Sequence, residues 1–276
     1  MAEIISEDAG SGGESTALEI AAQLYLDLMK KCLTRIIFPE TYRPMNNRPS
    51  KLNVKLFRYV PFDQAAREEG KDWPPEADTM IGLKRLENLQ YCVTEVIRKN
   101  VPGDLIETGV WRGGASIFMR ALLKVYRERT RLVWVADSFE GLPKPDGRYG
   151  QDAGDRHWKK SHTLAVSLEQ VQANFTRYGL LDEQVRFLVG WFKDTLPKAP
   201  INQLAVLRLD GDMYSSTMDA LQSLYRRLSP GGYVIVDDYG AIANCKRAVD
   251  DFRAEYKLTE QIHPIDWTGV FWQKLR

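Results

Sequence analysis

The sequence predicts an α/β fold of the Rossmann-like type: a mostly parallel, seven-stranded sheet that ends in an antiparallel hairpin, with a helical extension at the N-terminus. After Gly103, short apolar runs rich in β-branched residues alternate with segments of helical periodicity. Continuous apolar strands joined by crossover helices are typical of a parallel sheet covered on both faces. Near the C-terminus, two apolar runs are separated only by residues 266–268, and the second run begins at Gly269, which is typical of a hairpin.

The composition is that of an ordinary globular protein. The 276 residues are 44% hydrophobic and 27% charged, enough for one large domain or one domain with an extension. Because 38 Lys and Arg balance 37 Asp and Glu, no global charge attracts nucleic acid or an anionic membrane. The three cysteines lie far apart and form no metal-binding motif, so we expect a reduced, cytoplasmic setting. We find neither a signal-peptide pattern nor an apolar run long enough to span a membrane.

Three regions are expected along the chain. Residues 1–15 are acidic and rich in Gly and Ser, which predicts a disordered tail. Residues 16–100 are expected to form a helical extension that acts as a lid or an oligomer contact, because apolar residues recur at helical spacing over Thr16–Arg35 and again from Ile81 to Lys99. Between these two helices, five prolines mark a long surface excursion. Residues 101–276 are expected to form the core.

Within the core, five strands and three helices are expected before the hairpin. The strands cover 104–110, 132–138, 185–191, 204–210 and 233–239; the helices cover 116–129, 167–178 and 216–228; the hairpin covers 258–265 and 269–275. A parallel sheet of five strands finished by a hairpin is the outline of an S-adenosylmethionine-dependent methyltransferase. A dinucleotide dehydrogenase usually continues with a sixth parallel strand.

The first strand-to-helix turn separates two classes of cofactor. A dinucleotide fingerprint needs GxGxxG, whose second glycine lets the backbone approach a pyrophosphate, and in DLIETGVWRGGAS that place holds Trp111. S-adenosylmethionine has no phosphate, so its loop needs only a tight bend and an acidic residue, which Gly109, Gly113 and Glu107 provide. Asp137 ends the next strand, 28 residues after Gly109, where a carboxylate commonly binds ribose hydroxyls. The alternative is that the glycines only allow close packing and that Asp137 caps a helix.

Four aspartates follow the last two parallel strands. Asp210 and Asp212 come after one strand, and Asp237 and Asp238 come after the next. Carboxylates at neighbouring strand ends repel each other unless a cation neutralises them, and hard oxygen ligands suit Mg²⁺. We therefore expect Asp210, Asp237 and Asp238 to bind magnesium, while Asp212 contacts the substrate or shares in proton removal. The alternative is that these aspartates form turns or cap helices.

Several stretches of the core resemble the TylF/macrocin O-methyltransferase family, among them ETGVWRGGASIFMRALL, VADSFEGLP, RLDGDMYSSTMDAL and LSPGGYVIVDDY. The resemblance spans roughly Met80 to Lys274. It implies a magnesium- and S-adenosylmethionine-dependent O-methyltransferase that methylates a sugar hydroxyl of a natural product such as an antibiotic, macrolides and aminocoumarins included. The metal ligands it implies are the three aspartates named above, although catechol O-methyltransferases, which are similar in logic, typically place Asn where Asp238 stands.

The resemblance also implies a set of cofactor contacts. They are Thr79, Met80, Glu107, Thr108, Gly109, Val110, Trp111, Asp137, Ser138, Phe139, Gly141, Ser167, Trp191 and Phe192. The aromatic pair at the end of this set follows the third strand and is expected to pack on the adenine.

The expected reaction is an in-line transfer of a methyl group from a sulfonium to a hydroxyl. A sugar hydroxyl is a poor nucleophile, and coordination to Mg²⁺ is expected to lower its pKa and fix its position. Asp210 is the first candidate for the general base and Asp212 the second. His157 and His162 offer another base near pH 7; they belong to a polar insert over 149–162 that has the character of a mobile lid.

Rival functions are weaker but distinct. An NAD(P)-dependent oxidoreductase is opposed by Trp111 and by the terminal hairpin, and a non-catalytic subunit should have lost the acidic site. Among enzymes, a catechol or phenol acceptor is the nearest alternative to a sugar. The expected partner is a glycosylated small molecule, with assembly into a homodimer or higher oligomer and with no role for nucleic acid or a membrane.

Overall fold

A seven-stranded sheet forms the centre of the protein. The computed structural model describes residues 10–44, 57–145 and 147–276. The sheet has the order β5-β4-β3-β6-β7-β9-β8. Its strands are β3 (Asp104–Thr108), β4 (Val133–Asp137), β5 (Val185–Val189), β6 (Leu204–Leu209), β7 (Leu228–Val236), β8 (His263–Pro264) and β9 (Val270–Gln273). Strands β3 to β7 pair in parallel, and β9 pairs antiparallel with β7 and β8. The predicted parallel sheet with a terminal antiparallel hairpin is confirmed.

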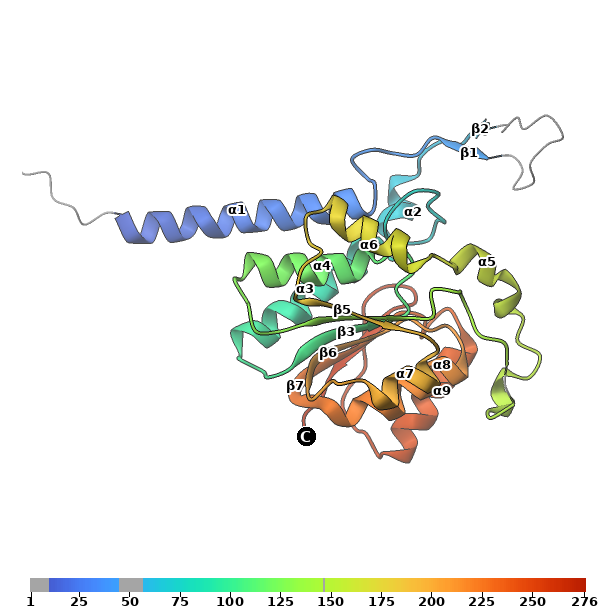
Figure 1. Ribbon diagram of the computed structural model, residues 1–276. Helices are drawn as coiled ribbons and strands as arrows, with labels where there is room; N and C mark the ends of the chain where they lie inside the picture. The colour runs from blue at the N-terminus through green and yellow to red at the C-terminus, as the bar shows by residue number, and fades with distance from the viewer. Residues whose placement is uncertain (1–9, 45–56, 146) are drawn as a thin grey trace, which may run out of the picture.

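Helices cover both faces of this sheet (Figure 1). One face carries α3 (Gly82–Arg98), α4 (Gly114–Val125) and α6 (Leu168–Arg177); the other carries α7 (Phe192–Thr195), α8 (Tyr214–Leu224) and α9 (Ala243–Glu255). Successive residues of β3 enter different cores, because Leu105 packs within the first helical layer and Ile106 within the second. Burial on both faces explains why the strands read as continuous apolar runs.

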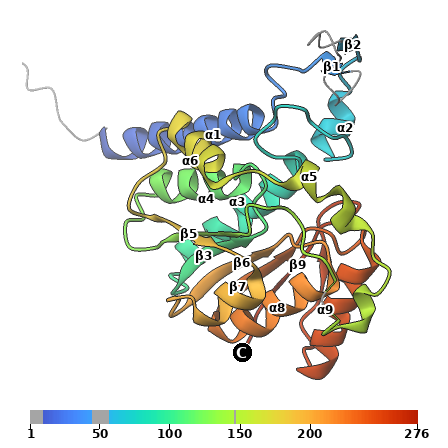
Figure 2. The same cartoon turned by 45° about the vertical axis from the view of Figure 1, so that its right-hand side comes forward.

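The N-terminal helix α1 (Gly10–Leu33) is longer than predicted and projects beyond the sheet (Figure 2). The helix begins at Gly10, within the segment 1–15 for which the sequence predicts a tail. Once a helix has formed downstream, each added residue closes a further hydrogen bond without the cost of a new nucleus. Residues 1–9 lie outside the described part of the chain. In the C-terminal half of α1, Leu26 and Leu33 are buried in the core that α3 and α4 share.

The proline-rich excursion between α1 and α3 contains regular structure. It holds the antiparallel pair β1 (Tyr42–Pro44) and β2 (Phe57–Tyr59) and the short helix α2 (Gln64–Glu68), whereas residues 45–56 lie outside the described part. The excursion then returns to α1, where the N–H of Asp78 donates to the carbonyl of Leu33 at 2.9 Å. Its last part consequently reaches the same edge of the sheet as the predicted site.

Some boundaries in the core differ from the prediction. The helix predicted over 216–228 ends at Leu224, and β7 already begins at Leu228. A glycine pair in β7 reads locally as a turn, but tertiary pairing makes it part of the strand: the N–H of Gly231 donates to the carbonyl of Lys274 at 2.7 Å. Helix α9 was not among the predicted helices. Within the described ranges, no helix is both long and apolar enough to cross a membrane.

Candidate active site

A cavity of about 1040 Å³ opens at the carboxyl ends of the parallel strands. Ligands of open α/β sheets bind at this edge, next to the point where the strand order reverses, which is here between β3 and β6. Most of the predicted site residues line this cavity: Thr79, Met80, Glu107, Gly109, Val110, Trp111, Asp137, Ser138, Gly141, Trp191, Phe192, Asp210, Asp212, Asp237 and Asp238. The structure thus brings the predicted cofactor residues and the predicted acidic residues into one space.

Three predicted cofactor residues do not line the cavity. Thr108 is buried, and its hydroxyl donates to a backbone carbonyl of β6 at 3.4 Å. The ring of Phe139 packs toward that of Phe187, with centroids 6.4 Å apart. Ser167 caps the N-terminus of α6, where its hydroxyl accepts a backbone hydrogen bond at 3.3 Å. Each of these side chains is engaged by the fold around the site.

The loop of residues 109–114, here called the glycine loop, passes directly over the end of β6. Gly109 has φ 88°, and a Cβ added there would lie 1.8 Å from the carbonyl oxygen of Asp210. At the other end of the loop, a Cβ on Gly114 would lie 2.4 Å from the carbonyl oxygen of Asp78. Only glycine fits this close approach, so the loop ties the last part of the excursion to the strand that bears the first aspartate.

Asp137 anchors the glycine loop through the backbone. Its Oδ2 accepts a hydrogen bond from the N–H of Val110 at 2.7 Å, and its Oδ1 accepts one from the N–H of Phe139 at 2.8 Å. Burial raises the pKa of this carboxyl, whereas the backbone donors act in the opposite direction. Each carboxylate oxygen can accept more than one hydrogen bond. Asp137 can therefore hold two loops in place and still accept hydrogen bonds from a ligand.

Trp111 lies in a stack at the wall of the cavity. Its backbone has φ 46°, the left-handed region that non-glycine residues seldom adopt. The guanidinium of Arg112 lies 4.1 Å from its ring centroid, and Trp73 meets it edge-on with centroids 6.1 Å apart. Trp73 comes from the excursion, so the tryptophan that excludes a dinucleotide fingerprint also joins the excursion to the glycine loop.

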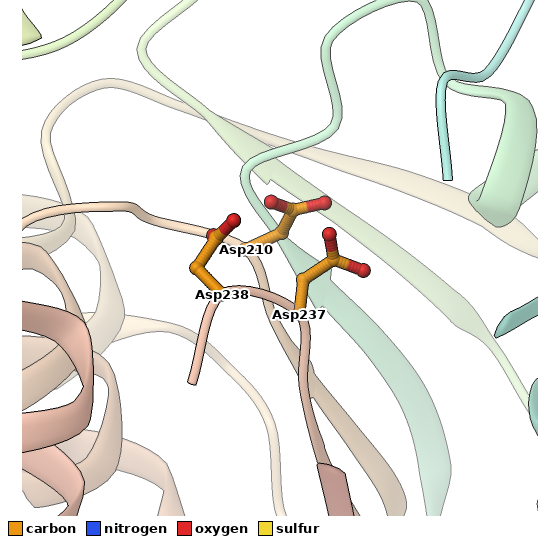
Figure 3. Close-up of side chains that lie close together, drawn as sticks. All are labelled: Asp210, Asp237 and Asp238. Carbon is orange, nitrogen blue, oxygen red and sulfur yellow. The ribbon is translucent and has the colours of Figure 1, made fainter. Parts of the chain in front are cut away.

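Asp210, Asp237 and Asp238, here called the acidic cluster, converge from the ends of β6 and β7 (Figure 3). One oxygen from each carboxylate lies within 4.8 Å of the others. Burial raises the pKa of Asp210 well above its ordinary value, and the charge of Asp237 adds to this effect. Burial also raises the pKa of Asp238, with a further contribution from the Asp212 carboxylate. The cluster is therefore costly to ionise without a cation.

Two buried arginines that the sequence did not predict contact this cluster. Arg208 donates from Nη1 to Asp210 Oδ2 at 2.9 Å and from Nη2 to Asp237 Oδ1 at 2.5 Å. Arg85, from α3, donates to the other oxygen of Asp237 and also lies 3.0 Å from Asp266 in the terminal hairpin. An arginine inside the apolar run LAVLRLD was a usable signal for Arg208. Arg85 gave none, because it is 152 residues from its partner.

The residues of the cluster fit a hard divalent cation. All the donors are carboxylate oxygens, the ligand type that Mg²⁺ prefers. Asp238 Oδ2 is buried and, within the described residues, has no hydrogen-bond partner. The arginines engage both oxygens of Asp237 but only one of Asp210, so oxygens of Asp210 and Asp238 remain for a metal ion.

Glu107 connects the glycine loop to this buried charge network. It faces Arg208 across β3 and β6, with Oε1 3.6 Å from Nε of the guanidinium, and it accepts a hydrogen bond from the hydroxyl of Ser116. Burial raises the pKa of Glu107 to about 7, although Arg208 acts in the opposite direction. One arginine therefore contacts a carboxylate of β3 beside the glycine loop and two carboxylates of the acidic cluster.

Asp212 and His157 both line the cavity and lie close enough to interact electrostatically. Asp212 has φ 58° and follows Asp210 by two residues. Burial raises the pKa of Asp212 to about 6, while a hydrogen bond with Asp238 and the charge of His157 act to lower it. His157 and His162 both line the cavity. The insert predicted to cover the acceptor therefore does reach the acidic end of the site.

The sequence and the structure are both similar to known O-methyltransferases. The family model of macrocin O-methyltransferase (TylF) matches residues 22–274. A relative from Streptomyces olivaceus, 8-demethyl-8-(2,3-dimethoxy-α-L-rhamnosyl)-tetracenomycin-C 4'-O-methyltransferase, is 56% identical over 256 residues, which cover 92% of this chain and 94% of the relative. Demethyldecarbamoylnovobiocin O-methyltransferase from Streptomyces niveus is 52% identical over 260 residues, covering 92% and 95%. The solved structure of the O-methyltransferase NovP superposes with a TM-score of 0.83 at 50% identity, covering 92% of this chain and all of NovP.

Proposed function

The chain belongs to the macrocin O-methyltransferase (TylF) family, and from this premise we propose that it transfers a methyl group from S-adenosylmethionine to a sugar hydroxyl of a glycosylated natural product, with Mg²⁺ bound by the acidic cluster. The observation that carries the proposal is the placement of the glycine loop and the acidic cluster in one cavity. The relative from Streptomyces olivaceus supports a sugar acceptor, because its name places the methylated oxygen on a rhamnosyl group.

The cofactor side of the cavity suits S-adenosylmethionine. The glycine loop bends tightly but carries bulk at Trp111, which a pyrophosphate does not permit. Asp137 keeps acceptor capacity for ribose hydroxyls while its backbone donors hold it in place. Trp191 and Phe192 line the same cavity and offer aromatic surface to an adenine. Ser167 is left out of this assignment because its hydroxyl caps α6.

The acidic side suits the acceptor and its metal. Among the described residues, one oxygen of Asp210 and Oδ2 of Asp238 have no hydrogen-bond partner and can bind Mg²⁺, and Asp237 is fixed between two guanidinium groups. When bound, Mg²⁺ supplies Lewis-acid chemistry that lowers the pKa of a hydroxyl and fixes its position. Asp212 lies beside the cluster and is placed to accept a hydrogen bond from a sugar hydroxyl. Because Arg208 occupies one oxygen of Asp210, we assign Asp210 to the metal rather than to proton transfer.

The proposed reaction is an in-line displacement. The acceptor oxygen forms a bond to the methyl carbon while the bond from that carbon to sulfur breaks, so the sulfonium becomes the thioether of S-adenosylhomocysteine and the hydroxyl proton is released. The chain's contribution is to hold both reactants in one cavity at fixed positions, which removes most of the entropic cost of their encounter.

The experiment is a methylation assay on a panel of acceptors. The purified protein is given S-adenosylmethionine, Mg²⁺ and, in separate reactions, 8-demethyl-8-(2,3-dimethoxy-α-L-rhamnosyl)-tetracenomycin C, demethyldecarbamoylnovobiocin and catechol. Mass spectrometry is expected to find one added methyl group on a glycoside, and excess chelator is expected to abolish the product. Methylation of catechol alone would refute the sugar acceptor and indicate a phenolic one. Full activity in excess chelator would refute the role of Mg²⁺.

We also propose that a second copy of the chain covers the outward face of α1. Ile20, Leu24 and Leu28 recur every four residues on the side of α1 opposite to the buried Leu26 and Leu33, and they are 56%, 65% and 52% exposed. Helix α1 projects from the body of the protein (Figure 1). A helix that is apolar on both its inward and outward faces is typically buried, and a net charge of +1 does not oppose self-association. Light scattering is expected to give at least a dimer for the wild type and a smaller species for Leu24→Glu. An unchanged mass for the variant would refute this interface.

A further inference from the structure

The insert between β4 and α6 is fastened to the two helices that follow the acidic residues. Asp152 is 1% exposed, and its two oxygens accept hydrogen bonds from the N–H groups of Tyr214 at 3.0 Å and Ser215 at 2.9 Å, the first residues of α8. Asn244, in the first turn of α9, donates to Asp155 Oδ2 at 3.0 Å. Carboxylates at helix N-termini are favourable. Figures 1 and 2 show the insert running beside α8 and α9.

This fastening presents an Asp–His pair to the cavity. Asp155 Oδ1 accepts a hydrogen bond from the N–H of His157 at 2.7 Å and lies 2.9 Å from Nδ1 of its ring. The Asp155 side chain is 3% exposed, whereas that of His157 is 53% exposed and lines the cavity. A carboxylate that accepts from Nδ1–H favours the tautomer in which Nε2 is unprotonated, so the nitrogen able to take a proton is the one turned away from Asp155.

Acidic and neutral groups lie around the His157 ring. Asp155, in the insert, lies 2.9 Å from the ring, and Asp212, in the loop between β6 and α8, interacts with it electrostatically. Asn244, which holds Asp155 from α9, is neutral. His162 also lines the cavity but has no comparable carboxylate assigned to it within the described residues.

We propose that His157 is the general base of the methyl transfer and that Asp155 is its positioning residue. This inference rests on the proposed function. Nε2 of His157 accepts the proton of the acceptor hydroxyl as that oxygen bonds to the methyl carbon. The electron pair of the breaking carbon–sulfur bond stays on sulfur, which gives S-adenosylhomocysteine. The half-exposed ring then returns the proton to solvent, so the site is reset without another reactant.

The test compares single-histidine variants of the magnesium-loaded enzyme, using the glycoside that the wild type methylates. His157→Ala is expected to lower kcat by about 100-fold or more, the usual contribution of a general base. Binding of S-adenosylhomocysteine, followed by tryptophan fluorescence, is expected to be unchanged. Added imidazole is expected to restore part of the lost rate. His263→Gln, in β8 and away from the cavity, controls for the loss of a histidine and is expected to match the wild type.

The following outcomes would contradict the assignment of His157 as the general base or of Asp155 as its positioning residue. A His157→Ala rate within about threefold of the wild type, or a loss that imidazole does not rescue, would leave His157 with at most a structural role. A loss confined to His162→Gln would move the base to that residue. Asp155→Asn is expected to lower kcat with little change in KM, and Asp155→Glu is expected to recover part of the rate; equal losses in both would refute positioning. Failure of the wild type on every acceptor would instead count against the proposed function.

Discussion

The two ends of the cavity are built by different physical means. At the cofactor end, the backbone sets the geometry: Gly109 passes over β6, and both oxygens of Asp137 accept backbone hydrogen bonds. At the acceptor end, charged side chains set it: three aspartates meet two buried arginines, and Asp238 keeps a buried oxygen with no partner among the described residues. The first end is held by hydrogen bonds to the backbone, whereas the second gathers buried carboxylates whose mutual repulsion a cation would reduce.

This difference predicts how each end fails. A site held by the backbone fails when its backbone is displaced, and substitutions there act on stability and on cofactor affinity. A site held by opposing charges tolerates neutral substitutions in the fold, because removing one of several buried like charges also removes repulsion. Substitutions in the acidic cluster are therefore expected to lower turnover rather than stability. The four predictions below test this contrast, beginning with the change that should damage both ends.

Gly109→Ala is expected to have the largest effect. Its new Cβ would lie 1.8 Å from the carbonyl oxygen of Asp210, and the residue would keep an unfavourable φ of 88°, so the end of β3 and the end of β6 must separate. We expect a loss of at least about 4 kcal/mol of unfolding free energy, or no folded protein. Gly150→Ala is the matched control, since a Cβ there meets nothing within 4 Å. Denaturant melts of the two variants measure the difference, and equal midpoints would refute the close approach.

Asp210→Asn is expected to break the acceptor end alone. The variant loses a metal ligand, so turnover should fall by at least about 10³-fold, the scale of a lost Lewis acid. Its melting temperature without metal should not fall, because the substitution relieves repulsion from Asp237. S-adenosylhomocysteine binding should be nearly intact by calorimetry. Asp194→Asn, exposed on α7, controls for removal of a carboxylate. A variant with normal turnover would exclude the acidic cluster as the metal site.

The sequence predicted the strand ends and loops that line the cavity more completely than the side chains that pack around them. Local sequence patterns predicted the strand ends, the glycine loop and the aspartates after β6 and β7. Each of these features forms a turn or comes directly after an apolar run. Arg85 is not, because it reaches Asp237 from 152 residues away and no local period marks it. Ser167 shows the converse: its place in a family motif suggested a ligand contact, but its hydroxyl caps α6. Long-range charge pairs and local caps need the fold before they can be assigned.

Asp137→Ala tests the backbone-held end with a smaller change. The substitution removes the acceptor for the N–H groups of Val110 and Phe139 and for ribose hydroxyls. We expect S-adenosylmethionine to bind more weakly by about 1 to 3 kcal/mol, the cost of leaving polar groups unpaired. Magnesium binding, measured by calorimetry, should change little because the acidic cluster does not contact Asp137. An equally strong loss of metal affinity and of cofactor affinity would contradict the inference that separate interactions hold the two ends of the cavity.

Glu107→Gln is expected to have the smallest effect and to sharpen the boundary between the two ends. Burial raises the pKa of Glu107 from 4.5 to about 7 in the folded state. A raised folded-state pKa means that the folded protein binds the proton more tightly than the unfolded chain. The stabilisation is therefore complete below about pH 4.5 and is lost as pH rises to about 7. Glutamine resembles the protonated acid, so in chelator the variant should lose this part of the pH dependence while its stability near pH 5 stays close to that of the wild type. Melting temperatures of the wild type and of the variant, measured across this pH range, check the prediction. Parallel profiles would mean that Glu107 stays ionised beside Arg208, so that its charge is part of the network at the acceptor end.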